Sequence, residues 1–89
     1  MPPMPKIQFE QQAFHQFLEW QDIDKGLHLK IRELIRDISR APFKGIGKPE
    51  PLKGDLKGYW SRRINHEHRL VYRVEPDNIF ILSCKGHYD

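Results

Sequence analysis

A glycine- and proline-rich stretch at residues 42–58 most limits what this chain can fold into. Of its 17 residues, four are glycine and three are proline: Gly45, Gly47, Gly54 and Gly58, with Pro42, Pro49 and Pro51. Glycine weakens helices and strands through backbone entropy, and proline removes a backbone donor. The stretch is therefore predicted to be a long ordered loop with a functional role. It separates a first half with helical periodicity from a second half with strand-like runs, which predicts an α+β fold.

Two amphipathic helices are predicted before this loop. The first spans Glu10–Gln21, and the second spans Lys25–Arg40 with Asp22 or Asp24 as its N-cap. Apolar or neutral residues recur every three or four positions in both: Phe14, Phe17, Leu18 and Gln21 in the first, and Leu27, Ile31, Leu34, Ile35 and Ile38 in the second. Ala41 ends the second helix because a residue before proline avoids the helical conformation. Both helices need a surface to cover.

Four short strands are predicted around these helices. One precedes them at Lys6–Phe9, and three follow the loop at Tyr59–Ile64, Arg69–Val74 and Asn78–Cys84. Residues 75–78 read Glu-Pro-Asp-Asn, with proline where a type I turn favours it.

The hairpin after the loop has two conceivable registers. A two-residue tip at Asn65-His66 pairs Arg62 with Arg69 and mixes apolar with charged side chains on each face. A three-residue tip at residues 65–67 pairs Arg63 with Arg69 and gathers the apolar groups on one face: Trp60, Ile64, Leu70, Tyr72 and Val74. A one-residue slip inverts every side chain, so we choose the second register. It predicts an antiparallel sheet with the two helices on one face and a basic, aromatic open face, and leaves Arg62 as a misfit on the apolar side.

Positive charge is concentrated in the second half of the chain. The 89 residues carry a net charge of only +3, but residues 44–73 hold eight Lys or Arg and three Asp or Glu, a local excess of +5. Local cation density drives the binding of polyphosphates. The stretch is therefore either an RNA-binding surface or an ordinary solvated basic surface.

The length and composition predict one domain over residues 6–89, after a disordered tail at residues 1–5 that holds three prolines. Met4 is an alternative native start. No run of about 18 apolar residues is present and the first residues lack an apolar signal core, so neither a membrane span nor a secretory signal is predicted. The single cysteine, Cys84, excludes an intramolecular disulfide and fits the reducing cytoplasm.

Glu50 and His87 form a candidate acid–base pair. Glu50 stands between Pro49 and Pro51, and the second proline restricts its backbone to extended conformations. Such stiffness preorganises a general base, although an exposed loop carboxylate is the simpler interpretation. His87 follows the last predicted strand, either as a general acid or as an unattached histidine near the chain end.

Other candidate residues favour structural roles. His66 and His68 are spaced to share a metal ion, but no further ligand motif accompanies them. Cys84 is expected to be a buried apolar residue rather than a nucleophile. Trp20 and Phe14 are expected in the core.

The loop and the strands after it carry the motifs of a known family. These are PFKGIGKPEPLK at residues 42–53, LKGYWSRRI at 56–64, EHRLVY at 67–72 and HY at 87–88. With Trp20-Gln21, Asp24-Lys25 and residues 33–35 in the helices, they resemble the YoeB branch of the RelE-type toxins over about residues 6–88. The resemblance implies the RelE-like fold, two helices against an antiparallel sheet. It also implies a ribosome-dependent endoribonuclease that cuts mRNA, and a cognate YefM-like antitoxin that neutralises it by direct binding.

The resemblance also assigns roles to individual residues. It implies a general base, a transition-state cation and a general acid: Glu50, Arg69 and His87. It implies three substrate-binding residues: Lys53, Arg63 and Tyr88. Cleavage of RNA in this way needs a base for the 2′-hydroxyl proton, an acid for the leaving 5′-oxygen and cations near the phosphate, so neither a metal nor a cofactor is implied. One residue, Asp89, follows Tyr88, where family members commonly end on the tyrosine.

Two other functions stay open at this point. ParE-like toxins share the fold and block DNA gyrase without being nucleases, and they do not need the set Glu50, Arg69 and His87. A bare RNA-binding module would carry that set incidentally. The partners implied by the preferred interpretation are the antitoxin, the ribosome and mRNA. A homodimer is a further option, and no membrane partner is expected.

Overall fold

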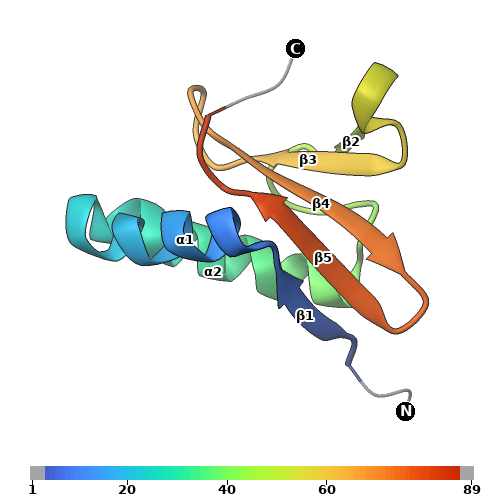
Figure 1. The fold of residues 1–89 in the computed structure, drawn as a ribbon, viewed down its shortest axis with the longest axis horizontal. Helices are drawn as coiled ribbons and strands as arrows, with labels where there is room; N and C mark the ends of the chain where they lie inside the picture. Colours follow the sequence, from blue (N-terminus) through green and yellow to red (C-terminus); the bar gives the residue numbers. More distant parts are fainter. Residues whose placement is uncertain (1–3, 87–89) are drawn as a thin grey trace.

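The two predicted helices and a sheet of five strands are present in the computed structural model, which describes residues 4–86 (Figure 1). The elements follow in the order β1 (Lys6–Phe9), α1 (Gln11–Ile23), α2 (Lys25–Arg40), β2 (Glu50–Pro51), a 3₁₀ turn (Gly54–Leu56), β3 (Tyr59–Arg63), β4 (Arg69–Glu75) and β5 (Asn78–Ser83). Predictions for residues 1–3 and for His87, Tyr88 and Asp89 lie outside the described residues.

Acidic side chains cap both helices. The Glu10 carboxylate accepts the backbone N–H of Gln12 at 2.7 Å, and Asp24 accepts that of Leu27 at 3.1 Å. Asp24 also donates its own N–H to the Trp20 carbonyl, which ends α1. It is therefore Asp24, and not Asp22, that separates the two helices. No helix within residues 4–86 is long and apolar enough to cross a membrane.

The core face was predicted correctly for α2 and only in part for α1. Ile31, Leu34 and Ile38 of α2 are fully buried. In α1, however, Phe14 is 47% exposed and Leu18 is 43% exposed, while Ala13 and Trp20 are buried. The small Ala13 lets α1 approach the end of β5, where its carbonyl lies 3.5 Å from the Cys84 sulfur. This contact rotates the helix away from the predicted face, so the prediction of a core Phe14 was wrong.

The sheet is mixed rather than wholly antiparallel. Its strand order is β1-β5-β4-β3-β2, and every pair is antiparallel except β1 with β5, which is parallel. The helices connect β1 to the rest of the sheet and lie together on one face of it (Figure 1). The predicted α+β architecture, with two helices on one face of a sheet, is confirmed, and the parallel edge strand corrects the predicted antiparallel sheet. The parallel pair arises because β1 occupies the edge of the sheet beside β5.

The predicted hairpin register is confirmed. Arg63 pairs with Arg69, and Trp60 pairs with Tyr72. The face toward the helices buries apolar residues of β4, of β5 and of the position just after β3: Leu70, Tyr72, Ile79, Ile81 and Ile64. A β-bulge beside Val71 makes that residue pair with Ser83, so the two stay on the open face.

Arg62, the misfit of the sequence pattern, is completely buried on the helix side of the sheet. Its guanidinium donates to the Asp37 carboxylate, to the Tyr72 hydroxyl at 3.2 Å and to three loop carbonyls, those of Ala41, Lys44 and Ile46. The Arg62 hydrogen bond holds the pKa of Asp37 below its usual value, and burial raises the pKa of Tyr72. Arg62 therefore ties the loop to both the helices and the sheet.

Candidate functional site

One row of the open face begins at Glu50. Glu50 pairs with Ser61, Ser61 with Val71, and Val71 with Ser83. Paired residues of neighbouring strands project to the same face, so the Glu50 side chain lies on the face opposite the helices. Ser61, Val71 and Ser83 are at most 4% exposed although no helix covers them. Glu50 itself is exposed at the end of the row.

The next row on the same face is the cation pair Arg63 and Arg69. The two residues pair directly across β3 and β4. Same-face residues two apart in a strand are about 7 Å apart, so Glu50 and Arg63 are diagonal neighbours within reach of long side chains. Arg63 is exposed, as is Lys53 beyond β2. Glu50, Arg63 and Arg69, predicted from separate parts of the sequence, are thus brought together on one face.

The loop that carries Glu50 is held from both sides. The Gly47 carbonyl accepts the backbone N–H of Arg63 at 2.6 Å, and Leu52 donates its N–H to the Tyr59 carbonyl at 2.9 Å. Lys48 adopts a left-handed backbone with φ of 52°, which is costly for a residue with a side chain. The surrounding contacts enforce this conformation two residues before Glu50. Glu50 itself lies in β2, so the extended backbone predicted from Pro51 is confirmed.

Arg69 is half-buried and faces the hairpin tip. Its Nη1 donates to the Asn65 carbonyl at 2.7 Å and to the His68 carbonyl at 3.2 Å. These bonds use one edge of the guanidinium and fix its orientation. An arginine held in this way offers its remaining N–H groups to an anion without a further loss of conformational entropy.

The segment after β5 returns to the same hairpin tip. The backbone N–H of Arg69 donates to the Gly86 carbonyl at 2.7 Å, and the Gly86 N–H donates to Nδ1 of His68 at 2.9 Å. Gly86 has φ of 82°, a conformation that favours glycine. His87, the next residue in sequence, and Tyr88 lie outside the described residues, and their assigned roles stay predictions.

Cys84 is fully buried, as predicted. Burial raises the pKa of its thiol to about 12, so the thiol stays protonated at neutral pH. Its backbone carbonyl accepts the Trp20 indole N–H at 2.8 Å, and its backbone N–H donates to the Gln16 side chain at 2.8 Å. Cys84 and Trp20 therefore anchor the segment after β5.

A third row of the open face is aromatic. It lies on the side of the Glu50 row opposite to Arg63 and Arg69. Arg73 pairs with Tyr59 and Phe80, and its guanidinium lies 5.1 Å and 4.9 Å from the centres of their rings. Glu75 binds the same guanidinium, and hydrogen bonds from Asn78 and then Arg73 hold the pKa of Glu75 below its usual value. Glu75 thus already neutralises the charge of Arg73, whereas Arg63 is exposed on its side of the face.

His68 is the site residue whose role the sequence patterns missed. The spacing of His66 and His68 suggested that they could share a metal ion. Within residues 4–86, however, no three His, Cys, Asp or Glu side chains come close enough to hold one. His68 instead binds Gly86 and packs against Trp20. The available signal was its position directly before Arg69 in the EHRLVY motif.

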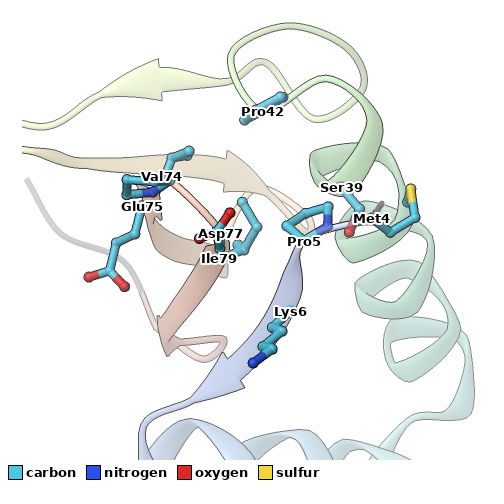
Figure 2. A pocket seen from close by; sticks show the side chains of 10 residues that line it. Met4, Pro5, Lys6, Ser39, Pro42, Val74, Glu75, Asp77 and Ile79 are labelled. Atoms are coloured by element: carbon cyan, nitrogen blue, oxygen red, sulfur yellow. The ribbon is translucent and has the colours of Figure 1, made fainter. Parts of the chain in front are cut away.

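A hollow of about 500 Å³ lies elsewhere on the molecule (Figure 2). The residues just before β1, the end of α2 and the β4–β5 turn line it. The turn is at the end of β4 opposite the hairpin tip that holds Gly86. None of the described candidate residues lines this hollow, so it is separate from the site on the open face.

Comparisons with known proteins agree with this fold. A family model for the YoeB-like toxin of bacterial type II toxin-antitoxin system matches residues 9–88. The class of protein is therefore a type II toxin with a RelE-like fold. Toxin YoeB of Escherichia coli (strain K12) is 51% identical over 83 residues, which cover 93% of this chain and 99% of that protein.

Two solved structures from Staphylococcus aureus are also similar. A YoeB dimer is 52% identical with a TM-score of 0.90, and a heterotetrameric YoeB-YefM toxin-antitoxin complex is 52% identical with a TM-score of 0.87. Each match covers 97% of this chain and 100% of the other. The chain belongs to the YoeB-like toxin family.

Proposed function

We propose that this toxin is an endoribonuclease that cuts mRNA on the ribosome. The observation that supports it best is the docking of Gly86 on the backbone of Arg69, on a sheet that presents Glu50 and Arg63 on its open face. This arrangement puts Gly86, the residue before His87 in sequence, beside Arg69 on the sheet face that carries Glu50 and Arg63.

The reaction needs a base, an acid and positive charge, and the chain supplies each. The Glu50 carboxylate takes the proton of a ribose 2′-hydroxyl as its oxygen attacks the adjacent phosphorus. The bond from phosphorus to the 5′-oxygen breaks, and the protonated His87 imidazole gives its proton to that oxygen. The products are a 2′,3′-cyclic phosphate and a 5′-hydroxyl. A positioned acid or base contributes about 10²–10⁴-fold in rate.

The cations and Tyr88 bind the substrate in this proposal. Arg69 stabilises the charge that develops on the non-bridging oxygens, while Lys53 and Arg63 hold the phosphate. Tyr88 positions the terminal segment or stacks on a base. Hydrogen-bond donors fixed before the reaction stabilise a transition state most effectively when water is excluded.

The exposure of these groups supports a dependence on the ribosome. Glu50, Lys53 and Arg63 all face solvent, where charge–charge interactions are weakened by the high dielectric constant of water. A large RNA partner that covers the open face would lower the local dielectric constant and strengthen every interaction in the site. The ribosome with its bound mRNA fits this requirement, and it places the activity in the cytoplasm.

The proposed regulator is a YefM-like antitoxin that binds the toxin directly, since a similar toxin is solved as a YoeB-YefM complex. The local excess of +5 in residues 44–73 suits an acidic antitoxin segment. A homodimer is a further proposed assembly, because another relative is solved as a dimer.

The function is tested with Glu50→Gln in a translating extract in which mRNA ends are mapped. This change keeps size and hydrogen bonding but removes proton acceptance, so cleavage should fall about 100-fold or more. Glu33→Gln, the same change on the exposed side of α2, should cleave normally, and adding the antitoxin should stop wild-type cleavage. Normal cleavage by Glu50→Gln would refute the assignment of the base. Absence of wild-type cleavage together with inhibition of DNA gyrase would favour the ParE-like function.

A further inference from the structure

His68 makes a contact that sets it apart from the other histidines of the described chain. Its Nδ1 accepts the backbone N–H of Gly86 at 2.9 Å. A backbone N–H only donates, so this nitrogen must carry a lone pair, and the proton of the neutral ring is on Nε2. The hydrogen bond therefore requires an acceptor at this one position of the ring.

His68 is itself held firmly in place. Its backbone N–H donates to the Asn65 side chain at 2.8 Å, and its carbonyl accepts the N–H of Ile64 at 2.9 Å. Its ring meets the Trp20 indole edge-on, with 4.8 Å between ring centres. The side chain of His68 is only 19% exposed. A rigid acceptor thus faces the segment after β5.

Each of the three residues after β5 has its own anchor. Trp20 and Gln16 bind the backbone of Cys84, and the Lys85 ammonium lies 3.9 Å from the Glu19 carboxylate. Gly86 is the last of the three, and it is bound by the side chain of His68 and the backbone of Arg69. The anchors of Cys84 and Lys85 come from α1, and only that of Gly86 comes from the strands that carry the candidate site.

We propose that His68 is a positioning residue for RNA cleavage. Its Nδ1 fixes Gly86 beside Arg69, and Gly86 is the residue that precedes His87 in sequence. The inference rests on the proposed function, because it assumes that His87 is the general acid. A misplacement of about 1 Å in a reacting group costs on the order of 100-fold in rate, so one hydrogen bond at the attachment point of the acid has a large effect on kcat.

The test is a pair of substitutions at His68, one that removes the hydrogen-bond acceptor and one that removes the ring. His68→Phe keeps a ring against Trp20 but removes the acceptor, and His68→Asn removes the ring but places its amide oxygen near the position of Nδ1. His68→Leu is a second variant without an acceptor, used if the phenylalanine variant does not fold. His66→Phe is the matched control, because His66 is exposed in the same hairpin tip.

We expect His68→Phe to lower kcat about 10- to 100-fold with KM little changed. His68→Asn should stay within about threefold of wild type, because it restores the hydrogen bond. The Gly86 amide should exchange with solvent faster in His68→Phe than in wild type or His68→Asn, which NMR measures directly. A purely structural role would show the reverse order, with phenylalanine tolerated and asparagine impaired.

Two results would overturn the inference: wild-type kcat in His68→Phe, or an equal loss of kcat in His68→Asn and His68→Phe. These outcomes are distinct from failure of the proposed function, which Glu50→Gln reports. If the wild type does not cleave RNA, the positioning role falls with the function, while Gly86 exchange still shows whether His68 holds this segment.

Discussion

Replacement of Arg62 by methionine should destabilise this fold more than any exposed substitution. Methionine matches the length of the arginine stem but carries no donor, so five hydrogen bonds are lost. The Asp37 carboxylate loses its cation and keeps the Ile46 N–H at 3.0 Å. The carbonyls of Ala41, Lys44 and Ile46 lose a buried donor and must turn to water, which opens the loop before Glu50.

The size of the effect follows from two opposing terms. Hydrogen bonds to a charged group are each worth about 1.5–3 kcal/mol. Five of them would sum to about 7.5–15 kcal/mol, as much as the whole stability of about 4–13 kcal/mol expected for a chain of this length. Desolvation of the buried guanidinium offsets much of that gain by several kcal/mol. Breaking a buried ion pair by removing one partner costs about 3–5 kcal/mol, and we expect Arg62→Met to fall in this range.

Urea denaturation followed by tryptophan fluorescence measures this loss. With an m value of about 1–2 kcal/mol per molar, the midpoint should fall by about 1.5–5 M. Arg63→Met is the matched control, because the neighbouring Arg63 is exposed on the other face of β3, and it should change the unfolding free energy by less than about 0.5 kcal/mol. A midpoint shift for Arg62→Met no larger than that of Arg63→Met would refute the reasoning, as would unchanged exchange protection of the Ile46 amide.

Two further predictions concern titratable groups. Because the Arg62 hydrogen bond lowers the pKa of Asp37 from its usual 3.8, Asp37 contributes stability that is present above that value and lost as the pH falls through the lower folded-state pKa. The difference in urea midpoint between wild type and Asp37→Asn should therefore be constant near neutral pH and shrink below about pH 4; a difference that persists into strong acid would contradict this. Because the pKa of the Cys84 thiol is raised to about 12, the native protein should resist iodoacetamide at pH 8 while the urea-unfolded chain reacts, as measured by mass; rapid alkylation of the native chain would contradict it.

The elements that could be predicted from the sequence are those with a long, regular pattern. The bounds and buried face of α2 follow from its repeated apolar positions, and the β3–β4 register follows from the choice that gathers Trp60, Leu70 and Tyr72 on one face. The face of α1 could not be predicted fully, because Ala13 and Trp20 are buried through contacts with Cys84, far away in sequence. The parallel pairing of β1 also depends on its distant partner β5, and no local pattern encodes it.

The candidate site divides in the same way. Arg63 and Arg69 lie on one face, as the parity of the strands indicated, but the sequence did not predict that Glu50 joins this face through β2 and its pairing with Ser61. Arg62 violated the alternating pattern. Its partners could not be inferred, because Asp37 lies on the charged side of a helix and three of the other four acceptors are backbone carbonyls. The hydrogen bond between His68 and Gly86 was likewise beyond prediction, since histidine spacing alone suggests a metal site.

The strand order has a consequence for folding during synthesis. β5 is the last strand to be synthesised, yet it lies between β1 and β4. The N-terminal strand therefore has no partner until nearly the whole chain has emerged, and pairings between distant segments form late in folding. Neither the five-stranded sheet nor the docking of Gly86 can exist on a nascent chain that still lacks β5 and Gly86. The pairing of β1 with β5 can therefore form only after β5 has left the ribosome, so this toxin completes its sheet late in synthesis.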